Sequence, residues 1–210
     1  RAETGRIYIM NLDHCNSHSS FKDKVSMSNL CQEITLPTTP IQDIHDDQGE
    51  IALCILSAVN VGGLNDLSEL ENICDLSVRA LEQIIDYQDY PVKAAEVSTK
   101  KRRSLGIGYI GLAHYLAKNG VKYSDPKAWD LVDRLTEAFQ YNLLRASCNI
   151  AMEKGKCEGF ERTKYADGLL PIDHYKKEID EIVPHKQRMA WESLRKDIAK
   201  YGLRHSTLSA

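Results

Sequence analysis

The sequence lacks the features that mark several large classes of protein. No apolar run approaches the roughly 18 residues of a membrane-spanning helix, and no signal peptide is present. The net charge of −3 reflects no excess of basic residues, so the composition gives no support for nucleic-acid binding. There is no internal repeat and no low-complexity segment. We therefore expect a cytoplasmic protein that binds neither membranes nor nucleic acids.

The cysteines also lack the pattern of a disulfide-stabilised secreted domain. Six cysteines are spaced irregularly along 210 residues, without a CxxC motif. Cys15 with His14 and His18 could supply three zinc ligands, although a fourth would have to come from elsewhere. The alternative is a polar turn whose Asn, Ser and Asp side chains satisfy the local backbone, and we expect no metal site.

What is present is the composition of an ordinary globular protein. Hydrophobic residues make up 42% and charged residues 27% of the chain, which is long enough to bury a substantial core. Residues with high strand propensity predict a strand over 5–12, followed by a polar loop over 13–18, and a short strand over 34–37. The apolar run 50–61, ended by two glycines, is typical of a buried strand in a parallel sheet.

Apolar residues at helical spacing fill much of the rest of the chain. They predict a helix that begins at Asp66, a long helix that begins at Asp125–Pro126 and ends at Gly155, and helices over 172–183 and 187–201. Residues 204–210 are predicted to begin another strand. Strands followed by strand–helix units and a helix-rich second half favour an α/β fold with a mainly parallel sheet.

A glycine motif and a basic run lie next to each other. The motif Gly106-x-Gly108-x-x-Gly111 superficially matches a dinucleotide-binding fingerprint. That fingerprint needs an apolar strand before its first glycine, and this chain has the sequence KKRRS there. The preferred interpretation is that Gly106 and Gly108 allow close backbone packing in a short strand before a helix. The run Lys100–Arg103 is expected to be a solvated turn, or alternatively to meet an anion.

The stretch most suited to chemistry is Ser28-Asn29-Leu30-Cys31-Gln32-Glu33. In an extended segment, residues 29, 31 and 33 line one face, so that an amide, a thiol and a carboxylate would point the same way. These groups could act on a polyol. The alternative from spacing alone is a loop in which Cys31 is a small buried apolar residue.

The chain closely resembles the large, catalytic subunit of aerobic class I ribonucleoside-diphosphate reductase. The resemblance is carried by eight stretches in family order, which span essentially the whole chain: GRIYIMNLDHCNSHSSF, SNLCQEITLPT, GEIALCILSA, ALEQIIDYQDYP, RRSLGIGYIG, YLAKNG, LLPIDHYKK and GLRHSTLSA. The most specific of them is the SNLC-x-EI stretch, followed at family spacing by ALC. The resemblance implies that residues 1–210 are one central segment of the subunit's catalytic domain, a ten-stranded α/β barrel whose catalytic cysteine lies on an inner loop.

The resemblance also assigns residue roles. It implies that Cys31 becomes a transient thiyl radical that removes the 3′ hydrogen atom of the substrate ribose. Since a neutral thiol is the form suited to hydrogen-atom transfer, we expect Cys31 to be buried and un-ionised. It implies that Glu33 takes the 3′-hydroxyl proton and that Asn29 bonds the ribose hydroxyls. Cys54 matches one member of the redox pair that ends the cycle as a disulfide. Ser28, Leu30 and Gln32 complete the stretch expected to contact substrate.

The same resemblance implies partners and missing parts. The other redox-pair cysteine and the ATP and dNTP effector sites are expected before Arg1, and the substrate-phosphate loop, the radical-relay tyrosines and a C-terminal cysteine pair after Ala210. A small subunit with a dimetal site would supply the radical, and thioredoxin or glutaredoxin the reducing equivalents. The segment itself is expected to bind no cofactor and to be inactive alone. The alternatives are a non-catalytic scaffold piece of a split subunit and a nucleotide-binding module that uses the glycine motif.

Overall fold

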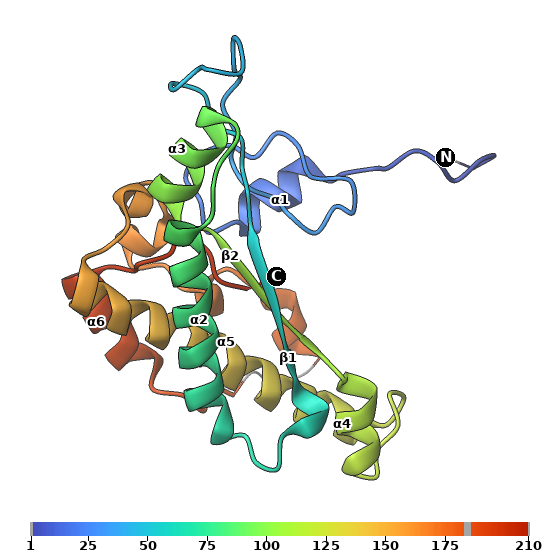
Figure 1. Cartoon of the computed structure of the whole chain (residues 1–210). Helices are drawn as coiled ribbons and strands as arrows, with labels where there is room; N and C mark the ends of the chain where they lie inside the picture. Colours follow the sequence, from blue (N-terminus) through green and yellow to red (C-terminus); the bar gives the residue numbers. More distant parts are fainter. Residues whose placement is uncertain (1, 183–185, 210) are drawn as a thin grey trace.

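The computed structural model describes residues 2–182 and 186–209 as an α/β fold built around two parallel strands (Figure 1). The strands β1 (Ile55–Asn60) and β2 (Leu105–Ile110) pair along their whole length, with Ile55 opposite Leu105. Parallel neighbours need a long crossover connection, and here it contains α2 (Glu69–Tyr87) and α3 (Lys93–Arg102). The predicted parallel arrangement is confirmed.

The other helices surround this unit. They are α1 (Leu12–His18), α4 (Leu112–Lys118), α5 (Pro126–Lys154) and α6 (Trp191–Tyr201). Short 3₁₀ turns span Val61–Gly63, Glu158–Arg162, Lys164–Asp167, Pro171–Asp173 and Lys177–Glu181. The helices α2 and α5 pack against each other, and α2 packs against β1. The ring of Tyr109 in β2 meets that of Phe139 in α5 edge to face, with 5.6 Å between ring centroids.

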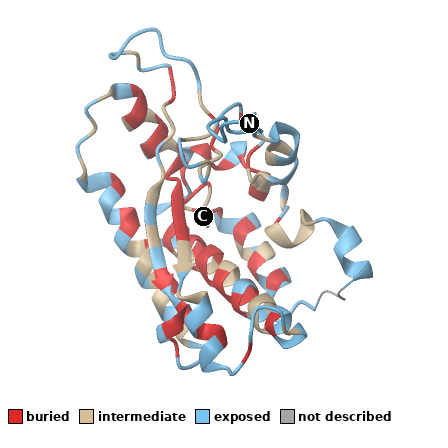
Figure 2. Ribbon diagram, turned by 90° about the vertical axis from the view of Figure 1, so that its right-hand side faces the viewer, coloured by how far each residue is buried: buried red, intermediate tan, exposed pale blue. Residues whose placement is uncertain are grey.

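The two strands differ in burial, as Figure 2 shows. In β2, Leu105 and Ile107 are fully buried, whereas in β1 the side chain of Leu56 remains 53% exposed. The strand predicted over 50–61 is therefore shorter and less buried than expected. The reason is that β1 has one strand neighbour in the described part of the chain, so its outer edge and one face are uncovered.

A third segment runs beside β2. The backbone N–H groups of Leu105 and Ile107 donate to the carbonyls of Thr207 and Leu208, at 3.1 and 2.8 Å. Ser209 forms an isolated parallel bridge with Ile107. The segment predicted as a strand over 204–210 thus hydrogen-bonds to β2 but forms no regular strand. Its last residue lies outside the described part.

The two main helices follow the predicted end signals. Pro126 occupies the first turn of α5 and Gly155, with φ +85°, follows its end. The helix α2 begins three residues after Asp66, because the Glu69 carboxylate accepts the N–H groups of Asn65 and Asp66, at 3.1 and 3.3 Å. The bond from Asp66 to Glu69 that the capping box requires is therefore present, but the cap of α2 is Ser68 and not Asp66, so the predicted start is wrong by three residues.

Two predictions near the N-terminus are wrong. Residues 5–11 form no strand and extend away from the body of the molecule (Figure 1), and Leu12 begins α1. Residues 13–18, predicted as a loop, lie in α1. There the Asn16 side chain donates to the carbonyls of Leu12 and Val25 and accepts the N–H of Val25, which ties the helix to the following segment.

Three further predictions also fail. Residues 34–37 form no regular strand. The helix predicted over 172–183 is replaced by two short 3₁₀ turns, and its last residue lies outside the described part. The last helix begins at Trp191 instead of 187, because Glu137 of α5 accepts the N–H groups of Arg188 and Met189, at 2.6 and 3.0 Å, and so holds them outside the helix.

Candidate functional site

The candidate site is a cavity of about 460 Å³ beside the two strands. Its walls come from segments that are far apart in the sequence. They include Glu33, Cys54, Leu56, Leu105, Gly106, Gln140, Tyr165, His174, Thr207 and Ser209. A carboxylate and a thiol predicted as site residues therefore face one cavity, together with hydroxyl and imidazole groups that were not predicted.

The segment around Cys31 is a tight turn and not an extended strand. Leu30 and Cys31 lie in the turn, which is closed by the Gln32 N–H donating to the carbonyl of Asn29 at 3.1 Å. Gln32 has φ +62°, which is uncommon for a residue other than glycine. The predicted alternation of side chains along 29, 31 and 33 is therefore wrong, although the placement on a loop is correct. Backbone strain of this kind is concentrated at functional sites.

Side chains within the segment hold this turn. Asn29 Oδ1 accepts the N–H of Ile34 at 3.0 Å and the hydroxyl of Ser28 at 3.2 Å. The Ser28 hydroxyl also lies 2.7 Å from the carbonyl oxygen of Ile34. Since Oδ1 is engaged inside the turn, the Nδ2 group of Asn29 is the part of this side chain that remains to donate to a ligand. Ser28 and Asn29 are half-buried, whereas Leu30 is 77% exposed.

The six predicted residues are not all brought to the cavity. Glu33 lines it, but Ser28, Asn29, Leu30, Cys31 and Gln32 are not part of its wall. Cys31 is exposed and unbridged in the turn, so the expectation of a buried thiol is wrong, both for the radical cysteine and for the alternative of a buried apolar residue. The turn thus places the Cys31 thiol outside the cavity wall that Glu33 and Cys54 share.

Cys54 lies just before β1, and its environment keeps the thiol protonated. Burial, together with the negative charge of Glu33, raises the pKa of Cys54 to about 12. At neutral pH it is a neutral thiol and therefore a poor nucleophile. Such a thiol suits hydrogen-atom or redox chemistry better than nucleophilic attack.

Four polar residues of the cavity were not predicted as site residues, although three of them, His174, Thr207 and Ser209, lie in stretches that resemble the family. Gln140 is a half-buried residue of α5, while Thr207 and Ser209 lie in a segment with no regular structure. His174 follows a 3₁₀ turn, and burial, assisted by Lys164, lowers its pKa. Only the fold brings these residues together, so no spacing rule could have found them.

The glycine motif has the predicted strand–turn–helix form but leaves no room for a dinucleotide at Gly111. Gly111 has φ +81° and precedes α4. A Cβ atom there would lie 2.5 Å from Asn60 Oδ1 and 3.2 Å from the backbone nitrogen of Gly62. The protein's own β1–α2 connection occupies the space next to Gly111, so close packing is found at the third glycine, whereas the packing proposed for Gly106 and Gly108 stays a prediction.

The basic run is not a solvated turn. Arg102 and Arg103 are 3% and 4% exposed, at the end of α3. Glu50 accepts a hydrogen bond from Arg102 Nε at 2.5 Å and one from Lys101 Nζ at 2.9 Å. Arg103 pairs with Glu82 and Asp86. The anions that these arginines bind are the protein's own carboxylates. The sequence did not predict these pairs because the partners are far apart along the chain.

The remaining predictions concern metals and membranes. Among the described residues, no group of three or more His, Cys, Asp or Glu side chains is arranged to hold a metal ion, and His14, Cys15 and His18 lie on α1. In the same part of the chain, no helix is both long and apolar enough to cross a membrane.

Parallel strands joined by helices, with a carboxylate and a protonated thiol at one cavity, define an α/β core with a candidate site beside its strands. The chain belongs to the ribonucleotide reductase barrel domain family, whose model matches residues 1–210. The chain is 59% identical to the ribonucleoside-diphosphate reductase subunit alpha of Haemophilus influenzae, 57% to that of Buchnera aphidicola (subspecies Baizongia pistaciae), and 54% to the ribonucleoside-diphosphate reductase 1 subunit alpha of Escherichia coli. In each comparison 100% of this chain is covered but only 28% of the relative's length. The predicted family is confirmed.

Proposed function

We propose that the chain is a segment of the catalytic barrel of a ribonucleoside-diphosphate reductase large subunit, with residues 1–210 forming one partial domain. The observation that carries the proposal is that Glu33 and Cys54 face one cavity, with Cys31 in a strained turn two residues before Glu33. The substrate class is ribonucleoside diphosphates and the products are 2′-deoxyribonucleoside diphosphates. The ten-stranded barrel, its inner loop and the cytoplasmic location stay predictions.

The proposed roles follow from the chemistry of each group. Cys31, as a thiyl radical, takes the 3′ hydrogen atom of the ribose, and Glu33 accepts the 3′-hydroxyl proton. Both are returned to the sugar at the end of the cycle, which restores the radical on Cys31. The 2′-hydroxyl leaves as water, and two thiols supply two electrons and two protons as they form a disulfide. Cys54 is one of these thiols, and its raised pKa keeps it protonated at neutral pH before it is oxidised to the disulfide. Asn29 Nδ2 and the neighbouring residues 28–33 orient the sugar.

The complete reaction involves groups beyond this chain. A small subunit with a dimetal site would supply the radical, thioredoxin or glutaredoxin would reduce the disulfide, and ATP and dNTP effectors would regulate the enzyme. The relatives are named as alpha subunits of this reductase, which supports such an assembly for them. We expect no reduction of ribonucleoside diphosphates by the 210-residue chain alone, even with a radical-bearing small subunit and thioredoxin.

The proposal is tested in the complete subunit assembled with its radical-bearing partner. Cys31→Ser should abolish formation of deoxyribonucleoside diphosphates, because a hydroxyl group cannot carry the radical. Cys54→Ser should block multiple turnovers while the 3′ hydrogen atom is still removed, measured as tritium release from 3′-labelled substrate. The matched control is Cys15→Ser, since Cys15 is half-buried on α1 and away from the cavity wall. Normal turnover by Cys31→Ser would refute the proposal and favour a scaffold role.

A further inference from the structure

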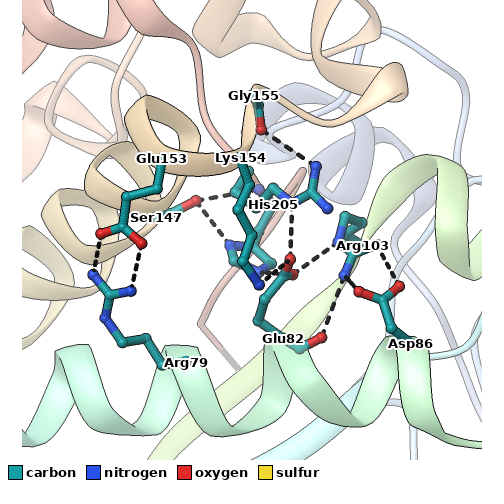
Figure 3. A network of polar contacts seen from close by, with 10 residues as sticks. Arg79, Glu82, Asp86, Arg103, Ser147, Glu153, Lys154, Gly155 and His205 are labelled. Atoms are coloured by element: carbon teal, nitrogen blue, oxygen red, sulfur yellow. Dashed lines mark hydrogen bonds and ion pairs between the residues drawn. The ribbon is translucent and has the colours of Figure 1, made fainter.

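The carboxylate of Glu82 in α2 is buried, and both of its oxygens accept hydrogen bonds. Glu82 is 1% exposed. The carboxylate accepts hydrogen bonds from Arg103 Nε at 2.8 Å, Arg204 Nε at 2.8 Å and His205 Nε2 at 3.0 Å (Figure 3). A buried carboxylate is unfavourable unless such partners satisfy it. The three partners come from two segments separated by about a hundred residues of chain, so Glu82 joins parts of the fold that are distant in sequence.

The hydrogen bonds define the state of the His205 ring. His205 is fully buried, and its Nδ1 atom lies 2.9 Å from the hydroxyl oxygen of Ser147 in α5. Because an ionised carboxylate can only accept, Nε2 carries the proton and Nδ1 accepts the Ser147 hydroxyl proton. Burial, assisted by Arg103 and Arg204, lowers the pKa of His205 against the opposing effect of Glu82. The ring is therefore neutral and fixed in one tautomer between α2 and α5.

The partners of Glu82 stand directly before two segments that line the cavity. Arg103 has a left-handed backbone, with φ +48°, and is followed by Ser104 and β2. His205 is followed by Ser206, whose N–H donates to the carbonyl of Arg102 at 3.0 Å. Beyond these points, Leu105 and Gly106 on one segment and Thr207 and Ser209 on the other line the cavity. One side chain from α2 thus sets the alignment of two walls.

We propose that Glu82 and His205 are positioning residues that hold the Thr207–Ser209 wall of the cavity in register with β2. They touch no reacting atom. They act through the backbone of residues 204–209, which lies beside β2 through the hydrogen bonds from Leu105 and Ile107. The claim that this alignment affects catalysis rests on the function proposed above. The claim that Glu82 and His205 align the wall with β2 does not depend on that function, so the two claims can be tested separately.

The test compares two substitutions of His205 in the complete subunit. His205→Leu keeps a similar volume but removes the bonds to Glu82 and Ser147. His205→Gln restores a donor near the position of Nε2. The control is Glu153→Gln, which breaks the half-exposed ion pair between Arg79 and Glu153 on the same two helices, with 2.6 Å between Nη2 and Oε1. Thermal unfolding of each variant shows whether it folds.

The first measurement is the alkylation rate of single thiols. Cys54 lines the cavity, whereas Cys74 and Cys148 are buried in α2 and α5. In His205→Leu the cavity wall loses one hydrogen bond to a charged group, so the wall should open more often and expose Cys54. We expect the alkylation rate of Cys54 to rise at least about tenfold, the factor that corresponds to such a bond. Cys74 and Cys148 should stay protected. Simultaneous exposure of all three thiols, or no change at Cys54, would overturn the proposal in favour of a general stabilising role.

The second measurement is steady-state kinetics. A wall misplaced by about 1 Å lowers kcat/KM by roughly a hundredfold, and His205→Gln should recover most of that loss. Glu153→Gln should behave as the wild type in both measurements. If the thiol result appears without any effect on nucleotide reduction, the alignment stands and the link to the proposed function fails. If His205→Gln is as impaired as His205→Leu although both are folded, the hydrogen-bond argument is wrong.

Discussion

The two cysteines proposed to take part in the reaction have different environments. Cys31 is exposed in a turn, whereas Cys54 is half-buried and its pKa is raised to about 12 by burial and by Glu33. Both are free thiols in the structure. The proposed chemistry requires this, because a disulfide between them would make the motif a structural crosslink.

We therefore predict that alkylation of the non-reduced chain labels both cysteines and labels Cys31 first. The thiolate is the form that reacts, and at pH 8 almost all of Cys54 is protonated. Peptide mass spectrometry after timed alkylation measures both rates. Cys74, whose pKa burial raises to about 12, is the internal control for a protected thiol. A linked Cys31–Cys54 peptide that persists in mild reductant would contradict the catalytic assignment.

A second residue-scale prediction concerns His205 and pH. The pKa of His205 is lowered in the folded state, where Glu82 of α2, Arg103 before β2, Arg204 beside it and Lys154 of α5 form its charged surroundings. Below the usual histidine pKa of about 6.5 the unfolded chain binds a proton that the folded chain does not. The free energy of unfolding should therefore fall as the pH drops from about 7 to 5, with a slope of at most about 1.4 kcal/mol per pH unit from this group.

Urea unfolding across this pH range checks the prediction, with His205→Gln as the comparison. The variant should show a smaller slope because it has no titrating group at this position. His174 contributes in the same direction in both proteins, since its pKa is also lowered, so the difference between the slopes isolates His205. Equal slopes would show that the pKa of His205 is the same in the folded and unfolded chains and would contradict the lowered pKa.

At the scale of elements, Gly111 controls how β2 joins α4. Its φ of +81° and the 2.5 Å that would separate an added Cβ atom from Asn60 Oδ1 both exclude a larger residue. Gly120, just after α4, has a similar φ of +68° but nothing within 4 Å of the corresponding position. A substitution at Gly120 therefore tests backbone strain alone, whereas a substitution at Gly111 tests backbone strain together with crowding.

We predict that Gly120→Ala lowers the free energy of unfolding by about 1 kcal/mol, the effect of a left-handed backbone on a residue with a Cβ atom. Gly111→Ala should add a further cost of about 1–3 kcal/mol from the forced movement of Asn60 and the β1–α2 connection. Urea unfolding of both variants measures this difference. Equal decreases in the free energy of unfolding would show that Asn60 moves aside without cost, and that crowding does not require a glycine at position 111.

At the scale of the whole molecule, the outer edge of β1 has no strand partner among the described residues. In the described part of the chain β1 pairs only with β2, and Leu56 is 53% exposed. An unpaired strand edge with exposed apolar side chains is a template for association with another chain. In the proposed subunit, other parts of the barrel would cover this edge.

The isolated 210-residue chain should therefore self-associate through β1, and Leu56→Lys should reduce the association. The matched control is Leu76→Lys on α2, because Leu76 is 58% exposed but lies on a helix that offers no unpaired backbone. Sedimentation velocity over a range of concentrations measures the effect. A monomeric wild-type chain, or equal effects of the two substitutions, would contradict the role of the edge.

The sequence by itself determined the elements whose signals are local. The long helix α5 begins at Pro126 and ends before Gly155 as predicted, since a proline in the first turn and a glycine after the last turn act within a few residues. The family could also be identified, because its motifs are contiguous stretches of sequence.

Only the tertiary structure decided the features that depend on distant partners. Arg103 is buried because Glu82 lies on a helix that packs nearby, and Thr207 reaches the cavity because its segment hydrogen-bonds to β2. The turn at Gln32 replaced an extended segment because Asn29 and Ser28 bond to Ile34 across it. Spacing along the chain predicts which face a residue occupies within a regular element, but it contains no information about which charges or carbonyls another element will place beside it.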